Sequence, residues 1–205
     1  MAVVIYGGAF DPFHLGHQYA IEQIPKEYDI TDLFVVPTFQ TPLKSRPLFS
    51  DEQRLQLLEK MVPELEGATS KIKIHIDRFE INRQTQTFAI DIIKHFKDRF
   101  QTQKIYFLMG SDCFFDLHKW KDIHTITKVI SLIVVKRDSI ETKKYREYFG
   151  EQFNAIPTKK LTIVGESFKD ISSSTIKLLF KNNDWEKYSP KTLIPLIYSF
   201  KKETL

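Results

Sequence analysis

Strand-like and helix-like patterns alternate along almost the whole chain. Short apolar runs predict β-strands at residues 3–6, 33–37, 71–77, 104–109, 129–135 and 161–164. The second, fourth and fifth runs are nearly continuously apolar, as in strands covered on both faces, whereas apolar and polar residues alternate in the third. Strands that alternate with helices favour a parallel sheet with right-handed crossovers. We therefore predict an α/β fold with a doubly wound, Rossmann-like parallel sheet, in which 71–77 lies at an edge or has one face in water.

Helix signals lie between these runs. Ser50 precedes Gln53 by three residues, which is a capping-box signature, and apolar residues then follow at helical spacing. Apolar residues at steps of four give residues 88–100 one face that can pack on the sheet. Further helices are expected around 143–149, from Ser173 or Ser174, and after Pro190. The chain is predicted to form one domain over 1–205, with a small C-terminal helical part at about 171–205.

Composition excludes several classes of protein. Of the 205 residues, 42% are hydrophobic and 27% charged, and no stretch approaches the roughly 20 apolar residues of a membrane-spanning helix. Because the N-terminal residues do not resemble a signal peptide, we expect a cytoplasmic protein without a membrane partner. The single cysteine, Cys113, allows no internal disulfide and is expected to be a small buried side chain.

The net charge of +4 could indicate a nucleic-acid partner. The basic residues are spread along the chain rather than gathered into arginine-rich runs. Small anionic ligands such as nucleotides are therefore favoured over a nucleic acid.

Two histidines follow the first predicted strand. Gly7 and Gly8 end that strand, and His14 and His17 come three residues apart at the expected start of a helix. Glycines let the backbone approach a ligand closely, and a helix start directs free backbone N–H groups at an anion. The pair could bind a phosphate chain or form part of a metal site. The strand, the two glycines and the Asp-Pro pair that precede the histidines favour phosphate binding.

The stretch GGAFDPFHLGH resembles the G-x-F-D-P-x-H-x-G-H signature of the nucleotidyltransferase superfamily. Within this superfamily, the chain is most similar over its whole length to bacterial nicotinate-nucleotide adenylyltransferases. The resemblance implies a transfer of the adenylyl group from ATP to nicotinate mononucleotide, with release of pyrophosphate. It assigns catalytic roles to His14, His17 and Lys177 and places magnesium on the triphosphate, with no metal site formed by the protein.

The same resemblance implies two sets of binding residues, and each has a simpler structural alternative. Asp112 could contact the ribose or cap a helix, Trp120 could stack on the nicotinate ring or belong to the core, and Thr87 could receive the ring substituent or serve as an N-cap. The expected ATP-binding residues are Gly8, Ala9, Phe10, Gly110, Asp112, Ile171, Ser172, Ser173 and Ser174. The expected substrate-binding residues are Lys44, Thr87, Trp120 and Arg137.

The chain departs from the family pattern at four positions. Leu43 stands where a histidine is usual before Lys44, and Gln86 replaces a tyrosine. Ser174 replaces a threonine, and Lys177 replaces an arginine. A lysine keeps the positive charge but loses the two-pronged geometry of a guanidinium group, so we expect phosphate binding with looser geometry.

Two other functions remain open at this point. The same chemistry could act on nicotinamide mononucleotide or on phosphopantetheine. Alternatively, the chain could be a non-catalytic protein that binds nucleotides or nucleic acid. Exposed apolar surface on the last helix could also serve as an interface between copies of the chain.

Overall fold

The computed structural model describes residues 1–26, 28–39, 47–69, 71–153, 157, 160–165, 171, 173–180 and 184–203. Within these residues, six strands form one sheet in the order β3-β2-β1-β4-β5-β6, and each neighbouring pair is parallel. The predicted fold class is therefore confirmed. The strands are β1 (Ala2–Gly8), β2 (Ile30–Pro37), β3 (Lys73–Ile76), β4 (Lys104–Gly110), β5 (Ser131–Val135) and β6 (Leu161–Val164).

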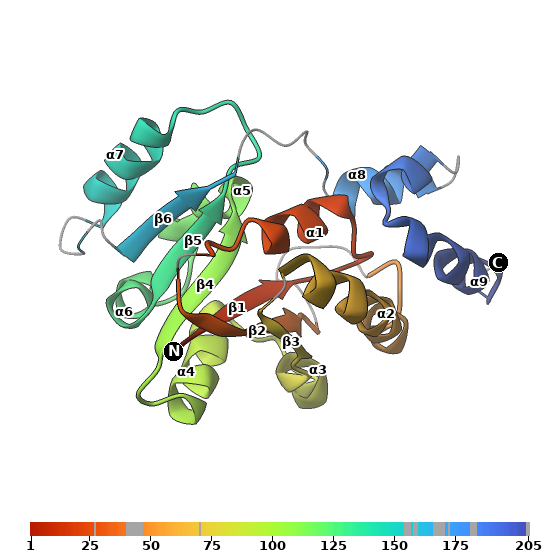
Figure 1. The fold of residues 1–205 in the computed structure, drawn as a ribbon, viewed down its shortest axis with the longest axis horizontal. Helices are drawn as coiled ribbons and strands as arrows, with labels where there is room; N and C mark the ends of the chain where they lie inside the picture. Colours follow the sequence, from red (N-terminus) through yellow and green to blue (C-terminus); the bar gives the residue numbers. More distant parts are fainter. Residues whose placement is uncertain are drawn as a thin grey trace.

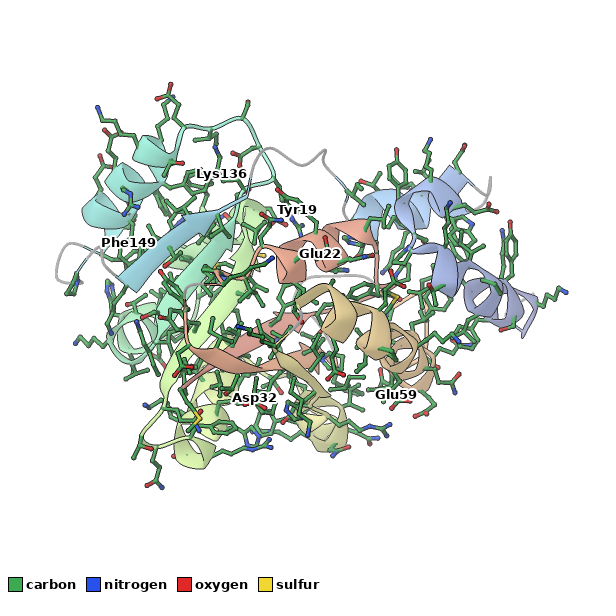
Figure 2. The ribbon with its side chains drawn as sticks, in the orientation of Figure 1. Tyr19, Glu22, Asp32, Glu59, Lys136 and Phe149 are labelled. Carbon is green, nitrogen blue, oxygen red and sulfur yellow. The ribbon has the colours of Figure 1, made fainter. Side chains whose placement is uncertain are left out.

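Helices cover both faces of this sheet, and their side chains fill the space between helices and strands (Figure 1 and Figure 2). On one face lie α1 (Leu15–Glu22) and α2 (Asp51–Thr69), and the C-terminal α9 (Ile194–Glu203) packs beside α2. On the other face lie α4 (Ala89–Arg99), α6 (Ile123–Val129) and α7 (Thr142–Gln152). No helix in the described part of the chain combines the length and the apolar character needed to cross a membrane. The shorter helices are α3 (Phe79–Arg83), α5 (Ser111–Phe114), η1 (Leu117–Lys119), α8 (Ser173–Leu179), η4 (Asp184–Tyr188) and η5 (Lys191–Leu193).

The central strand β1 contributes to the core on both faces. Val4 and Tyr6 pack with the α1 and α2 side of the molecule, whereas Val3 and Ile5 pack with the α4 and α6 side. Successive side chains of a strand point to opposite faces, so a strand covered on both sides must be apolar at every position. The continuous apolar runs therefore correspond to the inner strands, and the alternating run corresponds to the edge strand β3.

The two ladders of β1 differ in length. The pairing with β2 runs from Ala2 to Gly8, whereas the pairing with β4 ends where Ile5 meets Phe107. Strands β1 and β4 therefore part before their carboxyl ends. The strand order also reverses between β1 and β4, and in open α/β sheets this switch point is where ligands bind.

The described C-terminal residues pack on the α1 and α2 side. Phe49, which precedes α2, places its ring 5.6 Å from that of Phe180 and 6.0 Å from that of Phe200. The hydroxyl of Thr192 also donates to Glu64 of α2 at 2.8 Å. Helices α8 and α9 thus extend the molecule at the end opposite to α7 (Figure 1).

Some boundaries differ from the sequence prediction. The strand expected at 129–135 begins at Ser131, because Val129 ends the unpredicted helix α6. The strand expected at 71–77 is limited to Lys73–Ile76, the segment that pairs with β2. Short helices such as α6 have too few turns for a clear hydrophobic period, so their sequence signal is weak.

The capping box at the start of α2 is confirmed and makes a stability prediction. The backbone N–H of Gln53 donates to the Ser50 hydroxyl at 3.2 Å, and the N–H of Ser50 donates to the Gln53 side chain at 3.0 Å. We expect Ser50→Ala to lower the free energy of unfolding by about 1 kcal/mol, measured by urea denaturation. Ser139→Ala, at an exposed loop serine, is the control. Equal effects of the two substitutions would contradict a capping role.

Candidate active site

The histidine pair lies at the start of α1, directly after the loop that follows β1. His14 is the N-cap residue, and its Nδ1 accepts a hydrogen bond from the N–H of Gly16 at 3.1 Å. Nδ1 of His17 accepts one from the N–H of His14 at 3.2 Å. The two rings stack with their centroids 3.7 Å apart. These histidines therefore form a capping box in which imidazoles replace the usual hydroxyl and carboxylate.

This arrangement fixes the protonation of the rings. A ring nitrogen that accepts a hydrogen bond carries no proton, so the proton of each neutral imidazole resides on Nε2. Burial, together with the smaller effect of the positive charge of Arg137, lowers the pKa of His14 to about 3. His14 is thus neutral at physiological pH. In this tautomer a neutral ring presents an Nε2–H donor, and the neutral His14 supplies no positive charge.

Gly16 allows the histidine pair to form. A Cβ at this position would lie 3.0 Å from both Cε1 and Nδ1 of His14 and 3.4 Å from the carbonyl oxygen of Ile171. Any larger residue would displace the His14 ring. The same contact brings the segment before α8 next to the start of α1.

A second group of polar side chains lies at the ends of β4 and β5. The guanidinium of Arg137 lies 3.6 Å from the carboxylate of Asp112 and is hydrogen-bonded to Tyr6 of β1. Burial raises the pKa of the Tyr6 hydroxyl, so this group stays protonated. A Cβ on Gly110 would lie 2.3 Å from the carboxylate of Asp112 and 2.9 Å from the guanidinium of Arg137, so a larger residue would displace these side chains from their present contact. The interactions of Arg137 span the opening between β1 and β4.

The loop that follows β1 also contains a buried carboxylate. Asp11 is 1% exposed and accepts hydrogen bonds from the N–H groups of Leu48 and Phe49, each at 2.8 Å. Nζ of Lys177 on α8 lies 2.5 Å from the same carboxylate. The predicted catalytic lysine is thus located beside the histidine loop, in an ion pair.

The loop backbone itself is held from α2. Nη1 of Arg54 donates to the carbonyl oxygen of Ala9 at 2.7 Å, while Nη2 donates to Asp51 at 2.6 Å. Arg54 is fully buried, although it is a cation on a surface helix. Phe10, next to Ala9, is also fully buried, with its ring 4.8 Å from that of His17. Ala9 and Phe10 therefore offer a ligand their backbone rather than the Phe10 ring.

Thr87 and Trp120 belong to a neighbouring part of the same edge. The Trp120 ring is half-buried and meets Phe107 of β4 edge to face, with centroids 5.7 Å apart. Lys121 lies 4.8 Å from the ring centroid of Phe88, which connects this segment to the start of α4. The described contacts connect neither Thr87 nor Trp120 directly to the histidine pair.

Two local expectations are wrong. Thr87 is not the N-cap of α4; Phe88 occupies that position, and the Thr87 hydroxyl donates to the carbonyl of Thr85 at 3.1 Å. The N–H of Phe88 is bound by Asp91 at 3.0 Å, so the acid at the third helical position selects the start. Cys113 is exposed rather than buried, because α5 begins at the edge of the sheet and its second and third residues face outward.

The remaining predicted site residues are placed only in part. Gly8 ends β1, and Ser173 and Ser174 form the first turn of α8. Lys44 and Ser172 lie outside the described residues, as does Leu43. Among the described residues, no group of three or more histidine, cysteine, aspartate or glutamate side chains is arranged to hold a metal ion.

The sequence model of the cytidylyltransferase-like family matches residues 5–179. The chain belongs to this family. It is 33% identical over 150 residues to a probable nicotinate-nucleotide adenylyltransferase of Aquifex aeolicus, covering 73% of this chain and 85% of the relative. A protein of the same description from Aliarcobacter butzleri is 29% identical over 148 residues, covering 72% and 78%.

Solved structures of this cytidylyltransferase-like fold agree with the sheet topology. The Plasmodium falciparum nicotinic acid mononucleotide adenylyltransferase complexed with NaAD superimposes with a TM-score of 0.77 at 22% identity, covering 97% of this chain and 95% of that one. A putative nicotinate-nucleotide adenylyltransferase from Vibrio parahaemolyticus gives a TM-score of 0.63 at 18% identity, covering 96% and 99%. At these identities, the likeness establishes the shared fold.

Sequence reasoning missed three buried charged residues around the site: Asp11, Arg54 and Glu80. Arg54 carried a signal, because it falls on the same helical face as the buried Leu58, Met61 and Leu65. Asp11 was part of the quoted signature, but nothing local indicated its partners. Nothing in the sequence indicated that Glu80 is buried, since most residues around it in the chain are charged or polar.

Glu80 makes a prediction about pH. It is 1% exposed, and its Oε2 has no hydrogen-bond partner in the described part of the chain. Burial raises its pKa from the usual 4.5 to about 7, although a hydrogen bond from the Phe39 backbone and the charge of Arg54 oppose this change. Between about pH 4.5 and 7, Glu80 therefore holds a proton in the folded state, whereas it has released that proton in the unfolded state. This contribution to stability is complete below about pH 4.5 and is lost as pH rises through about 7.

We expect Glu80→Gln to remove this pH dependence. Relative to the native chain, the variant should gain stability between pH 4.5 and 8 by on the order of 1–3 kcal/mol, measured by urea denaturation across that range. Glu52→Gln, at an exposed position on α2, is the control and should show no such trend. A constant difference between Glu80→Gln and the native chain at all pH values would contradict the raised pKa.

Proposed function

We propose that the chain catalyses adenylyl transfer from ATP to nicotinate mononucleotide, forming nicotinate adenine dinucleotide and pyrophosphate. The observation that carries this proposal is the stacked histidine pair, which begins α1 directly after the loop that follows β1, beside the β1/β4 switch point. The descriptions of the two curated relatives support the choice of acceptor. The complex of the Plasmodium falciparum structural neighbour with NaAD, the proposed product, supports it further.

The reaction requires placement and charge stabilisation more than proton transfer. The 5′-phosphate of the mononucleotide is already an anion at neutral pH, and it attacks the α-phosphorus of ATP. A neutral His14 is suited to this task, since an Nε2–H group can donate to phosphate oxygens as negative charge builds on them. Transfer of this kind is assisted mainly by positioning and by electrostatic stabilisation.

The other residues divide between the two substrates. We assign Asp112 to the ribose of ATP, and the backbone of Gly8 to Phe10 together with Ile171 and Ser172 to Ser174 to its phosphates. Lys177 supplies positive charge to the departing pyrophosphate. Trp120 stacks on the nicotinate ring, Thr87 receives its carboxylate, and Lys44 approaches the phosphates. Arg137, which follows β5, binds the substrate and also forms an ion pair with the carboxylate of Asp112.

Magnesium enters as part of the MgATP substrate. The carboxylate of Asp11 is engaged by two backbone N–H groups and a lysine, so it is not suited to replace the water ligands of a magnesium ion. The chemistry that magnesium supplies is neutralisation of the triphosphate charge. We further propose that residues 1–205 act as one nucleotidyltransferase domain, which the packing of Phe49 on Phe180 and Phe200 supports.

An acceptor assay tests this function. The purified protein is incubated with MgATP and one of three acceptors: nicotinate mononucleotide, nicotinamide mononucleotide or phosphopantetheine. Released pyrophosphate is then measured. We expect the highest kcat/KM with nicotinate mononucleotide. A preference for another acceptor would overturn the proposed substrate, and no pyrophosphate with any acceptor would indicate a non-catalytic protein.

The histidine roles can be tested without removing the helix cap. Asparagine is a good N-cap and glutamine suits the third position of a capping box, so His14→Asn and His17→Gln can keep the backbone hydrogen bonds while an amide N–H replaces the imidazole Nε2–H in a different geometry. We expect each to lower kcat by about 10²–10³-fold, with little change in the thermal unfolding midpoint. Lys202→Ala, on the exposed side of α9, is the control. Near-normal kcat in a folded His17→Ala variant, which has no side-chain donor, would rule out the proposed donor role.

A further inference from the structure

Asp11 joins three segments of the molecule through one carboxylate. It lies in the loop that leads from β1 to His14, it binds two N–H groups of the segment that enters α2, and it contacts Lys177 on α8. Two of these partners are backbone groups and one is a cation. The position of Asp11 is therefore fixed from the α2 side, independently of Lys177.

The charge of Asp11 needs a partner. A carboxylate that is 1% exposed lacks the stabilisation that water gives, and removal of the opposite charge from a buried pair is strongly destabilising. Lys177 supplies this opposite charge. Its side chain is nevertheless 29% exposed, so the ammonium group is not enclosed in the way the carboxylate is.

The number of donors on the ammonium group makes a second contact possible. A lysine ammonium has three N–H donors, and a single ion pair with Asp11 does not engage all of them. The others can bind a phosphate while the ion pair remains intact. A flexible four-carbon side chain would otherwise place its charge loosely, which is the cost expected of lysine where the family pattern has arginine.

We propose that Asp11 is a positioning residue, which holds the ammonium group of Lys177 beside the histidine loop so that its free N–H donors meet the phosphates of ATP. This inference rests on the proposed adenylyl transfer. Asp11 itself does not touch the substrate. Its role is to convert a mobile cation into one that is already in place when ATP binds.

A double-mutant cycle tests this role. The variants are Asp11→Asn, Lys177→Met and the two combined, and for each we measure the free energy of unfolding and the kcat and KM for ATP and for nicotinate mononucleotide. We expect Asp11→Asn and Lys177→Met each to lower kcat/KM for ATP by about 10–100-fold, with less than about threefold change in KM for the mononucleotide. Relative to the two single variants, the combined variant should recover part of the free energy of unfolding. It should keep the low kcat/KM of Lys177→Met, because Asp11 acts through Lys177.

Two outcomes would overturn the proposal. If the ion pair is only structural, the combined variant regains both stability and activity. If Asp11 acts independently of Lys177, the two kinetic losses multiply.

The exposed pair Asp184 and Lys187 in η4, 3.9 Å apart, provides matched controls. Asp184→Asn and Lys187→Met should leave the kinetics unchanged.

A conservative pair of variants covers the case in which Asp11→Asn does not fold. Lys177→Arg keeps both the ion pair and spare N–H donors, so it should retain kcat/KM for ATP within about tenfold of the native value. Asp11→Glu keeps the charge but moves it by one methylene group, so it should lower kcat/KM for ATP without the stability loss of an unpaired charge. Native kinetics in a folded Asp11→Glu variant would contradict the positioning role.

Failure of this inference can be distinguished from failure of the proposed function. The native chain is assayed first with the three acceptors, and the cycle is then run with whichever acceptor it uses. If no acceptor releases pyrophosphate, the proposed function has failed, and ATP affinity measured by calorimetry replaces kinetics. Under the proposal, Asp11→Asn still weakens ATP binding by about tenfold, whereas unchanged affinity would overturn it.

Discussion

The hydrogen bonds that His14 and His17 accept from the backbone constrain the start of α1 and the chemistry of the site at the same time. Each imidazole uses Nδ1 to hold an N–H group that the helix cannot satisfy itself. The ring is thereby oriented, and its proton is placed on the opposite nitrogen. One set of contacts thus determines where the helix begins, which tautomer is present and where the donors lie. Gly16 suits this arrangement because a side chain at this position would press on the His14 ring.

Much of the fold could be predicted from local patterns. A parallel strand buried on both faces must be apolar throughout, so the inner strands were visible as continuous runs, and the alternation at Ile72, Ile74 and Ile76 marked an edge strand. The start of α2 was visible because a capping box lies within four residues. These features depend on residues that are close in the sequence, which explains why the sequence alone was informative.

The electrostatic contacts of the site could not be predicted in the same way. Asp11 forms an ion pair with Lys177 on α8, and Arg54 on α2 binds the carbonyl oxygen of Ala9 in the loop after β1. Both contacts form only when segments that are distant in the sequence come together. The start of α4 also shows the limit of local reasoning. Thr87 was a possible N-cap, but the N-cap is Phe88, whose N–H is bound by Asp91 at the third helical position. Which residue begins a helix depends on packing, which sequence spacing does not reveal.

The early end of the ladder between β1 and β4 has a consequence for the range of reactions that such a backbone can serve. The opening arises because two strands part after Ile5, so it is a property of the main chain and not of a particular lining side chain. Side chains at its rim can then change without closing it. A family described as cytidylyltransferase-like and a relative described as an adenylyltransferase both match this chain, as expected of one backbone that can carry different side chains at this opening.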